Sequence, residues 1–116
     1  MKRRRAEIRG RRGEIIAAWW LRLHGWRILA TRAKTRFGEV DLIARRGNMI
    51  AFIEVKTRAT LAELDIAIDR RRLTRVAAAA NLLAARYAPD GVDIRIDVML
   101  IHPWAWPRHL TNVWHG

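Results

Sequence analysis

A chain of 116 residues is long enough to bury the core of one ordinary domain and too short for two. Its hydrophobic fraction of 51% and charged fraction of 29% are those of a globular protein, which excludes general disorder. The absence of both cysteine and serine excludes disulfides, thiolate metal ligands and Ser or Cys nucleophiles.

The charge is strongly positive, because 23 lysines and arginines face 11 acids and leave a net charge of +12. Such an excess is typical of proteins that bind polyanions, and nucleic acid is the expected partner class, with DNA favoured over RNA. A solvated basic surface or a ribosome-associated protein is the alternative that charge alone leaves open.

The first expected element is a helix over residues 13–24, in which Ile16, Trp19, Trp20 and Leu23 recur at helical spacing and Gly25 follows as a left-handed helix end. Residues 1–12 form a basic N-terminal arm ahead of it. The apolar run 15–21 is only seven residues long, so we expect no signal peptide and no membrane span. The chain is therefore expected to be a cytoplasmic protein of bacterial type.

Residues 26–30 predict a short strand, after which three basic residues alternate along the chain. In an extended backbone Arg32, Lys34 and Arg36 would all lie on one side. This row could contact phosphates, and a plain solvated strand edge explains it equally well.

Two β-rich runs at 40–44 and 49–55 flank a turn sequence and predict an antiparallel hairpin. Asp69 then precedes a second helix as its N-cap, with a single apolar stripe made of Leu73, Val76, Ala77, Ala80, Leu83, Ala84 and Tyr87. Residues 92–101 alternate as a last strand, which should return parallel to 49–55.

The C-terminal segment, residues 102–116, is rich in tryptophan, and we expect its tryptophans to pack onto the body. The four histidines are scattered without an acid at ligand spacing, which favours surface or packing roles. Taken together, residues 1–116 predict a single α/β domain with a mixed central sheet of four or five strands, flanked by helices.

The hairpin carries the candidate chemistry. A turn about residues 47–48 makes paired positions sum to 95, so that Asp41 lies opposite Glu54 in a non-hydrogen-bonded pair, with Cα atoms about 4.5 Å apart. Two carboxylates at that distance repel unless a divalent cation, a proton or a basic side chain lies between them. The same register places Glu39 opposite Lys56.

Lys56 lies two residues after Glu54 and therefore on the same face of its strand. An all-oxygen pocket beside one lysine suits Mg²⁺ or Mn²⁺ and favours phosphodiester hydrolysis. The alternative is structural: Glu39 and Lys56 form a cross-strand ion pair and Glu54 is a solvated strand residue.

The motifs Gly-Glu-Val-Asp-Leu-Ile-Ala at 38–44 and Phe-Ile-Glu-Val-Lys-Thr-Arg at 52–58 resemble the PD-(D/E)xK nuclease superfamily. Gly-Glu at 13–14, the arginine-rich second helix and Arg-Ile-Asp-Val at 95–98 extend the likeness to the bacterial YraN-like family, which usually has a lysine at the position of Arg72. The first half is also similar to archaeal-type Holliday junction resolvases.

The resemblance implies a restriction-endonuclease-like core in which Asp41 and Glu54 ligate Mg²⁺ or Mn²⁺ together with the carbonyl of Val55. Lys56 would position the attacking water and Glu14 would complete the site. Nucleic-acid contacts are expected from Arg32, Lys34, Arg36, Arg58 and Arg72.

The implied activity is metal-dependent cleavage of DNA, such as branched recombination or repair intermediates, and cleavage of a junction would favour a homodimer. A binding module on the same fold, without catalysis and directed at nucleic acid or protein, is the alternative.

Overall fold

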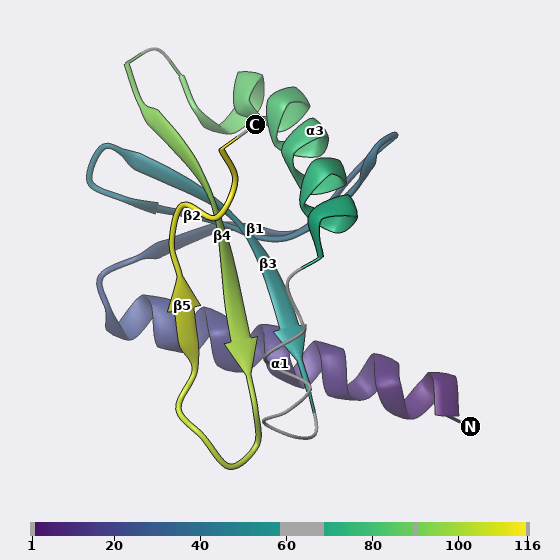
Figure 1. The fold of residues 1–116 in the computed structure, drawn as a ribbon. Coiled ribbons are helices and arrows are strands. Elements are labelled where there is room, and N and C mark those ends of the chain that lie inside the picture. Colours follow the sequence, from purple (N-terminus) through teal and green to yellow (C-terminus); the bar gives the residue numbers. More distant parts are fainter. Residues whose placement is uncertain (1, 59–68, 90, 116) are drawn as a thin grey trace.

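The computed structural model describes residues 2–58, 69–89 and 91–115. In this part of the chain, five strands form one sheet in the order β1-β2-β3-β4-β5, with one helix on each face (Figure 1). The elements are α1 (Lys2–Leu23), β1 (Arg27–Thr35), β2 (Gly38–Arg46), β3 (Met49–Thr57), α3 (Arg70–Tyr87), β4 (Asp93–Ile101) and β5 (Arg108–Leu110). The predicted α/β class with a mixed central sheet is confirmed, and the arrangement is consistent with a restriction-endonuclease-like core.

Helix α1 begins well before the predicted start. It runs without interruption from Lys2 to Leu23, so most of the segment expected as a basic arm belongs to the helix. Gly25 follows with a φ of 86°, as expected of a left-handed helix end.

The face that α1 turns to the sheet combines small residues with one leucine. Ala17, Ala18 and Leu21 are buried there, whereas the periodic residues Trp19 and Leu23 are 59% and 78% exposed. Ile16 is also exposed, and of the predicted stripe only Trp20 is half-buried. Small side chains let the helix approach the sheet closely, and at Gly13 a Cβ would clash with the Thr57 hydroxyl, 1.9 Å away.

The hairpin register is confirmed. Strands β2 and β3 pair antiparallel from Leu42 with Ile53 to Arg46 with Met49, and every pair sums to 95. Strand β4 lies parallel to β3, as expected of a crossover connection.

The two faces of the sheet hold separate clusters. Helix α1 packs against Ala51 and Ile53 of β3, and α3 packs against Ile50 and Phe52 of the same strand. Because side chains alternate along a strand, Glu54 continues the series that faces α3. The position of α3 therefore determines the surroundings of Glu54.

Helix α3 begins as the sequence predicts. The Asp69 side chain accepts a hydrogen bond from the Arg71 backbone N–H at 2.9 Å, so it is the N-cap. Leu73, Val76 and Ala80 are buried on the predicted stripe. Neither helix in the described residues is long and apolar enough to cross a membrane.

The C-terminal segment adds a strand that the sequence does not predict, since β5 pairs antiparallel with β4. Trp114 is half-buried and packs near Leu73 and Val98. Trp104 and Trp106 are 88% and 79% exposed, so the expectation that the tryptophans pack onto the body is wrong for these two. Pro103 and Pro107 lie beside these two tryptophans, and their fixed φ angles restrict the conformations of the loop between β4 and β5.

Asp97 anchors this segment. Its buried carboxylate accepts hydrogen bonds from Arg95 Nε (2.8 Å) and Nη2 (3.0 Å), from His109 (2.7 Å) and from the Asn112 N–H (2.9 Å). Burial alone would raise the pKa of Asp97, but the bonds from His109, Arg95 and Asn112 outweigh it and hold the pKa below its ordinary value. His109 thus has an acidic partner that lies 12 residues away in the sequence.

Candidate active site

The candidate site lies where β2 and β3 stop pairing. Their ladder ends at Leu42 and Ile53, one pair before the expected pair of Asp41 and Glu54. Beyond this point the Val55 N–H donates to Asp41 Oδ2 at 2.8 Å. A side-chain oxygen thus replaces the backbone acceptor, and the Asp41 carboxylate lies at the seam between the two strands.

Glu54 is the most buried of the predicted site residues, at 1% exposure. Its Oε1 accepts from Arg72 Nε at 2.5 Å and lies 3.4 Å from Lys56 Nζ. Its Oε2 is buried and has no partner among the described residues. One oxygen is thus neutralised by two cations, while the other is free to accept a ligand.

Asp41 is close enough to both other acids to feel their charges. Burial, then the charge of Glu54 and to a smaller extent that of Glu14, raises the pKa of Asp41 to about 7, against the opposing hydrogen bond from Val55. The predicted repulsion between Asp41 and Glu54 is therefore present. Near neutral pH a proton or a cation would relieve it.

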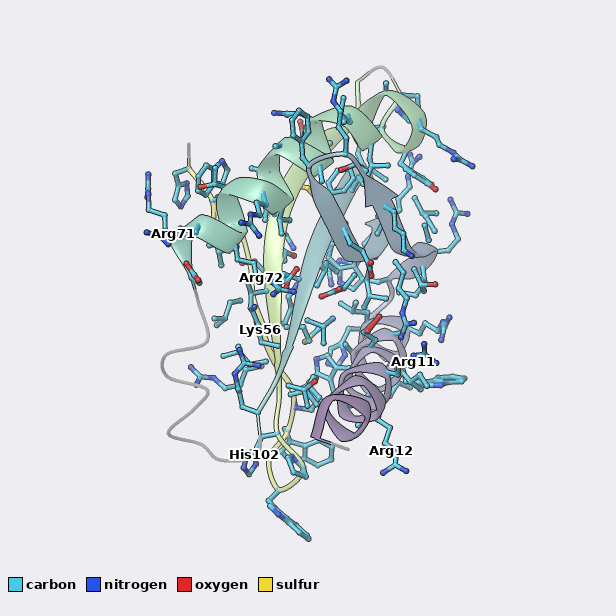
Figure 2. All side chains as sticks on the ribbon, turned by 90° about the vertical axis from the view of Figure 1, so that its right-hand side faces the viewer. Arg11, Arg12, Lys56, Arg71, Arg72 and His102 are labelled. Carbon is cyan, nitrogen blue, oxygen red and sulfur yellow. The ribbon has the colours of Figure 1, made fainter. Side chains whose placement is uncertain are left out.

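Lys56 is buried beside Glu54 on the α3 side of the sheet, close to Arg72 (Figure 2). Burial lowers its pKa against the opposing charge of Glu54, and the charges of Arg72 and Arg58 lower it further. The backbone pairing of β2 with β3 ends at Leu42 and Ile53, so the expected pair of Glu39 with Lys56 is not part of the ladder. In the described residues Lys56 forms its ion pair with Glu54 and none with Glu39, so the structural alternative of a Glu39–Lys56 ion pair is wrong.

Glu14 approaches the seam from α1. Its carboxylate accepts from Arg32 at 3.1 Å (Nε) and 3.5 Å (Nη2), while its charge contributes to the raised pKa of Asp41. Glu14 is therefore near Asp41 but already has a cationic partner. The structure brings Asp41, Glu54 and Lys56 together and leaves Glu14 at the edge.

The predicted row of basic residues on β1 is irregular. Arg32 has a φ of 50° and turns to Glu14, and Arg36 lies beyond the end of β1, 5.0 Å from the centre of the Phe37 ring. Only Lys34 is an exposed strand residue as expected. The left-handed conformation of Arg32 breaks the alternation on which the row depends.

The other two predicted phosphate contacts, Arg58 and Arg72, are close enough to Lys56 for their charges to lower its pKa. Arg58 is half-buried after β3 and donates to the Thr57 carbonyl at 2.8 Å. Arg72 is 56% exposed in its side chain although it holds Glu54.

A small cavity opens beside Glu54. Its volume is about 170 Å³, and Gly38, Glu39, Arg72, Arg75 and Val76 complete its wall. Arg75 is a residue that the sequence-based site lacks. Its spacing of three from Arg72 on a helix is the signal that could have placed it there.

The candidate metal ligands at this seam are oxygens of Asp41, Glu54 and Val55. The described residues contain no group of three or more His, Cys, Asp or Glu side chains placed to hold a metal ion. Mg²⁺ commonly takes only one or two carboxylates and keeps several waters, so Asp41 and the free Oε2 of Glu54 suit it. The Val55 carbonyl points to the same seam as its N–H, because both groups of one residue face the same antiparallel neighbour. The residues present therefore fit a hard divalent cation.

Comparison with known proteins identifies the family. A family model described as "Uncharacterised protein family UPF0102" matches residues 13–101. A UPF0102 protein of Rhizorhabdus wittichii is 64% identical over 115 residues, which cover 99% of this chain and 98% of that protein. Those of Sphingopyxis alaskensis and Erythrobacter litoralis are 62% and 60% identical, each over 98% of both chains. The chain therefore belongs to the UPF0102 family.

Proposed function

We propose that this protein is a metal-dependent endonuclease that acts on DNA, on a YraN-like variant of the PD-(D/E)xK nuclease core. The observation that carries the proposal is the buried Glu54, which has one oxygen without a partner beside Asp41 and Lys56. Buried acids in such surroundings are costly for stability alone, and such costs are commonly found at functional sites.

Mg²⁺ or Mn²⁺ would be held by Asp41, the free oxygen of Glu54 and the Val55 carbonyl. When bound, the metal would supply charge stabilisation at the phosphate and lower the pKa of a water. Lys56 has a pKa lowered by burial, so its amine is poised to hold that water and take part in proton transfer. Glu14 supports the site through its charge on Asp41.

The DNA backbone would lie against the N-terminal turn of α3. The first turn of α3 contains no acid, and Arg70, Arg71 and Arg72 lie at the positive end of the helix dipole. Three cations there repel one another and the dipole, and a bound phosphate would remove this cost. Arg75 lines the cavity beside Glu54 and can reach the same anion.

A second candidate is a binding module without catalysis. The ion pairs of Arg72 and Lys56 with Glu54 favour it, because they already neutralise much of the buried charge. In this version the acids stabilise the docking of α3, and DNA binding needs no metal.

The test is cleavage of labelled linear, flap and four-way DNA with Mg²⁺ or Mn²⁺ by the parent, by Asp41→Asn and by Asp93→Asn. Asp93 is an exposed acid at the start of β4 and serves as the matched control. We expect the parent and Asp93→Asn to cut and Asp41→Asn to bind without cutting. Metal-independent binding with no cleavage of any DNA would favour the binding module, and preference for RNA would favour the ribosome-associated alternative.

Two further expectations accompany the proposal. Cleavage of a four-way junction requires two sites, so a homodimer is expected if that substrate is preferred. A DNA-directed role is also consistent with a cytoplasmic location.

A further inference from the structure

A second and larger cavity lies between α1 and strands β1 and β2. Its volume is about 510 Å³, within the roughly 300–1,000 Å³ of sites that hold a small organic ligand. Residues that line it include Arg11, Glu14, Trp19, Arg22, Arg32 and Leu42. It meets the candidate active site at Glu14.

Trp19 gives this cavity an open aromatic surface. Its side chain is 59% exposed, and the guanidinium of Arg22 lies 5.1 Å from the ring centre. Ile15 beside it is equally exposed. A large aromatic that the core does not use, next to a cavity, is suited to stack on a flat ring, and every nucleobase has such a face.

The charges around the cavity select an anion. Arg11 and Arg22 are exposed on α1, where Arg11 projects outward (Figure 2), and Glu14 is already paired with Arg32. Three guanidinium groups thus face one carboxylate. Arg11 and Arg22 are exposed at the rim, and Arg22 lies over one face of the Trp19 ring, so a phosphate beside a base stacked on the other face could reach both cations.

The same charges disfavour a second copy of this chain as the occupant. In a two-fold symmetric dimer the same patch meets itself, so Arg11 and Arg22 of the two copies would be brought together. Like charges across an interface cost affinity. A polyanion with aromatic rings meets both features of the cavity.

We propose that this cavity binds one unpaired nucleotide of a DNA strand, with its base on Trp19 and its phosphate on Arg11 and Arg22. A base inside a duplex is stacked and cannot reach Trp19, so the cavity would favour DNA with a flap, gap or branch. The inference rests on the proposed function, because it assumes that DNA approaches the site containing Asp41 and Glu54.

The experiment measures the affinity of two DNA probes in EDTA by fluorescence anisotropy: a blunt duplex, and the same duplex with a single-stranded flap. The variants are Trp19→Ala, Trp19→Phe and, as the matched control, Trp104→Ala, which removes an even more exposed tryptophan that does not line the cavity. We expect Trp19→Ala to weaken flap binding by roughly 5- to 150-fold, the loss of one base–aromatic stack. Blunt-duplex binding should not change.

Trp19→Phe should keep most of the flap affinity, because it retains an aromatic face, and Trp104→Ala should behave as the parent. Equal losses on both probes, or none, would overturn the cavity proposal while DNA binding stands. A parent that binds neither probe would overturn the proposed function as well. A dimer that dissociates in Trp19→Ala, seen by sedimentation, would assign the cavity to a second copy of the chain and overturn the proposal.

Discussion

Replacing Asp41 by asparagine should stabilise the protein above neutral pH when no divalent metal is present. The substitution removes one of two repelling charges and keeps the side-chain carbonyl oxygen that can accept the Val55 N–H. It changes neither the volume of the side chain nor the packing around it. The effect should therefore report charge alone.

The magnitude follows from the pKa of Asp41, which burial and Glu54 raise from 3.8 to about 7. A folded state that binds this proton more tightly than the unfolded chain loses stability as the pH rises between these two values. At about 1.36 kcal/mol for each tenfold change in the acidity constant, the loss reaches about 4 kcal/mol by pH 8. Asparagine carries no such loss.

The assay is chemical denaturation of the parent and Asp41→Asn at pH 5 and pH 8, in EDTA and in millimolar Mn²⁺. In EDTA the variant should gain on the parent between pH 5 and pH 8. In Mn²⁺ the gap between the two proteins at pH 8 should shrink by more than half, because metal bound only to the native parent adds about 2.7 kcal/mol at a hundredfold excess over Kd.

Two results would refute this reasoning. A variant less stable than the parent in EDTA at pH 8 would mean that the Asp41 charge is favourable in the fold. A parent whose stability ignores Mn²⁺ would remove the metal site, and would leave the raised pKa as a structural feature.

Other consequences can be measured separately. DNA affinity should fall steeply between low and moderate salt, because a net charge of +12 releases several counterions per complex; a flat titration contradicts polyanion binding. Lys56→Ala should bind DNA as the parent does but fail to cut it, whereas the exposed control Lys34→Ala should still cut in the same cleavage assay. Asp97→Asn should lower the free energy of unfolding by about 3–5 kcal/mol, because it breaks a buried ion pair with Arg95 and weakens the bond to His109. Since the pKa of Asp97 is lowered, the parent should lose this contribution below about pH 4 in acid melts, and the variant should not.

The features that the sequence predicts well depend on short-range rules. Alternation and a two-residue turn determine the β2–β3 register, which brings Asp41 to the strand that carries Glu54. The N-cap at Asp69 likewise depends on groups two residues apart. Both are set by the local backbone, so no knowledge of the tertiary fold is needed.

The contacts that the sequence does not predict depend on how distant elements pack against one another. Arg72 contacts Glu54 only because α3 packs over β3, and His109 reaches Asp97 only because β5 pairs with β4. The buried face of α1 also differs from the sequence prediction, since apolar spacing favours Trp19 while the close approach of the helix to the sheet selects Ala17. Periodicity identifies a helix, but the shape of the partner surface decides which side is buried.

The two cations on Glu54 imply a coupling between DNA and metal if the proposed function is right. Arg72 and Lys56 repel a divalent ion that approaches the free oxygen of Glu54, so the metal should bind weakly to the protein alone. Arg72 is 56% exposed and can turn to a phosphate, which would leave Glu54 with less neutralising charge and a stronger demand for a cation. DNA would then raise the affinity for metal, and by thermodynamic reciprocity metal would raise the affinity for DNA by the same factor. The Arg72–Glu54 ion pair therefore does not distinguish the two roles of Glu54. A purely structural Glu54 would form this pair, and so would a metal site that assembles only when DNA binds.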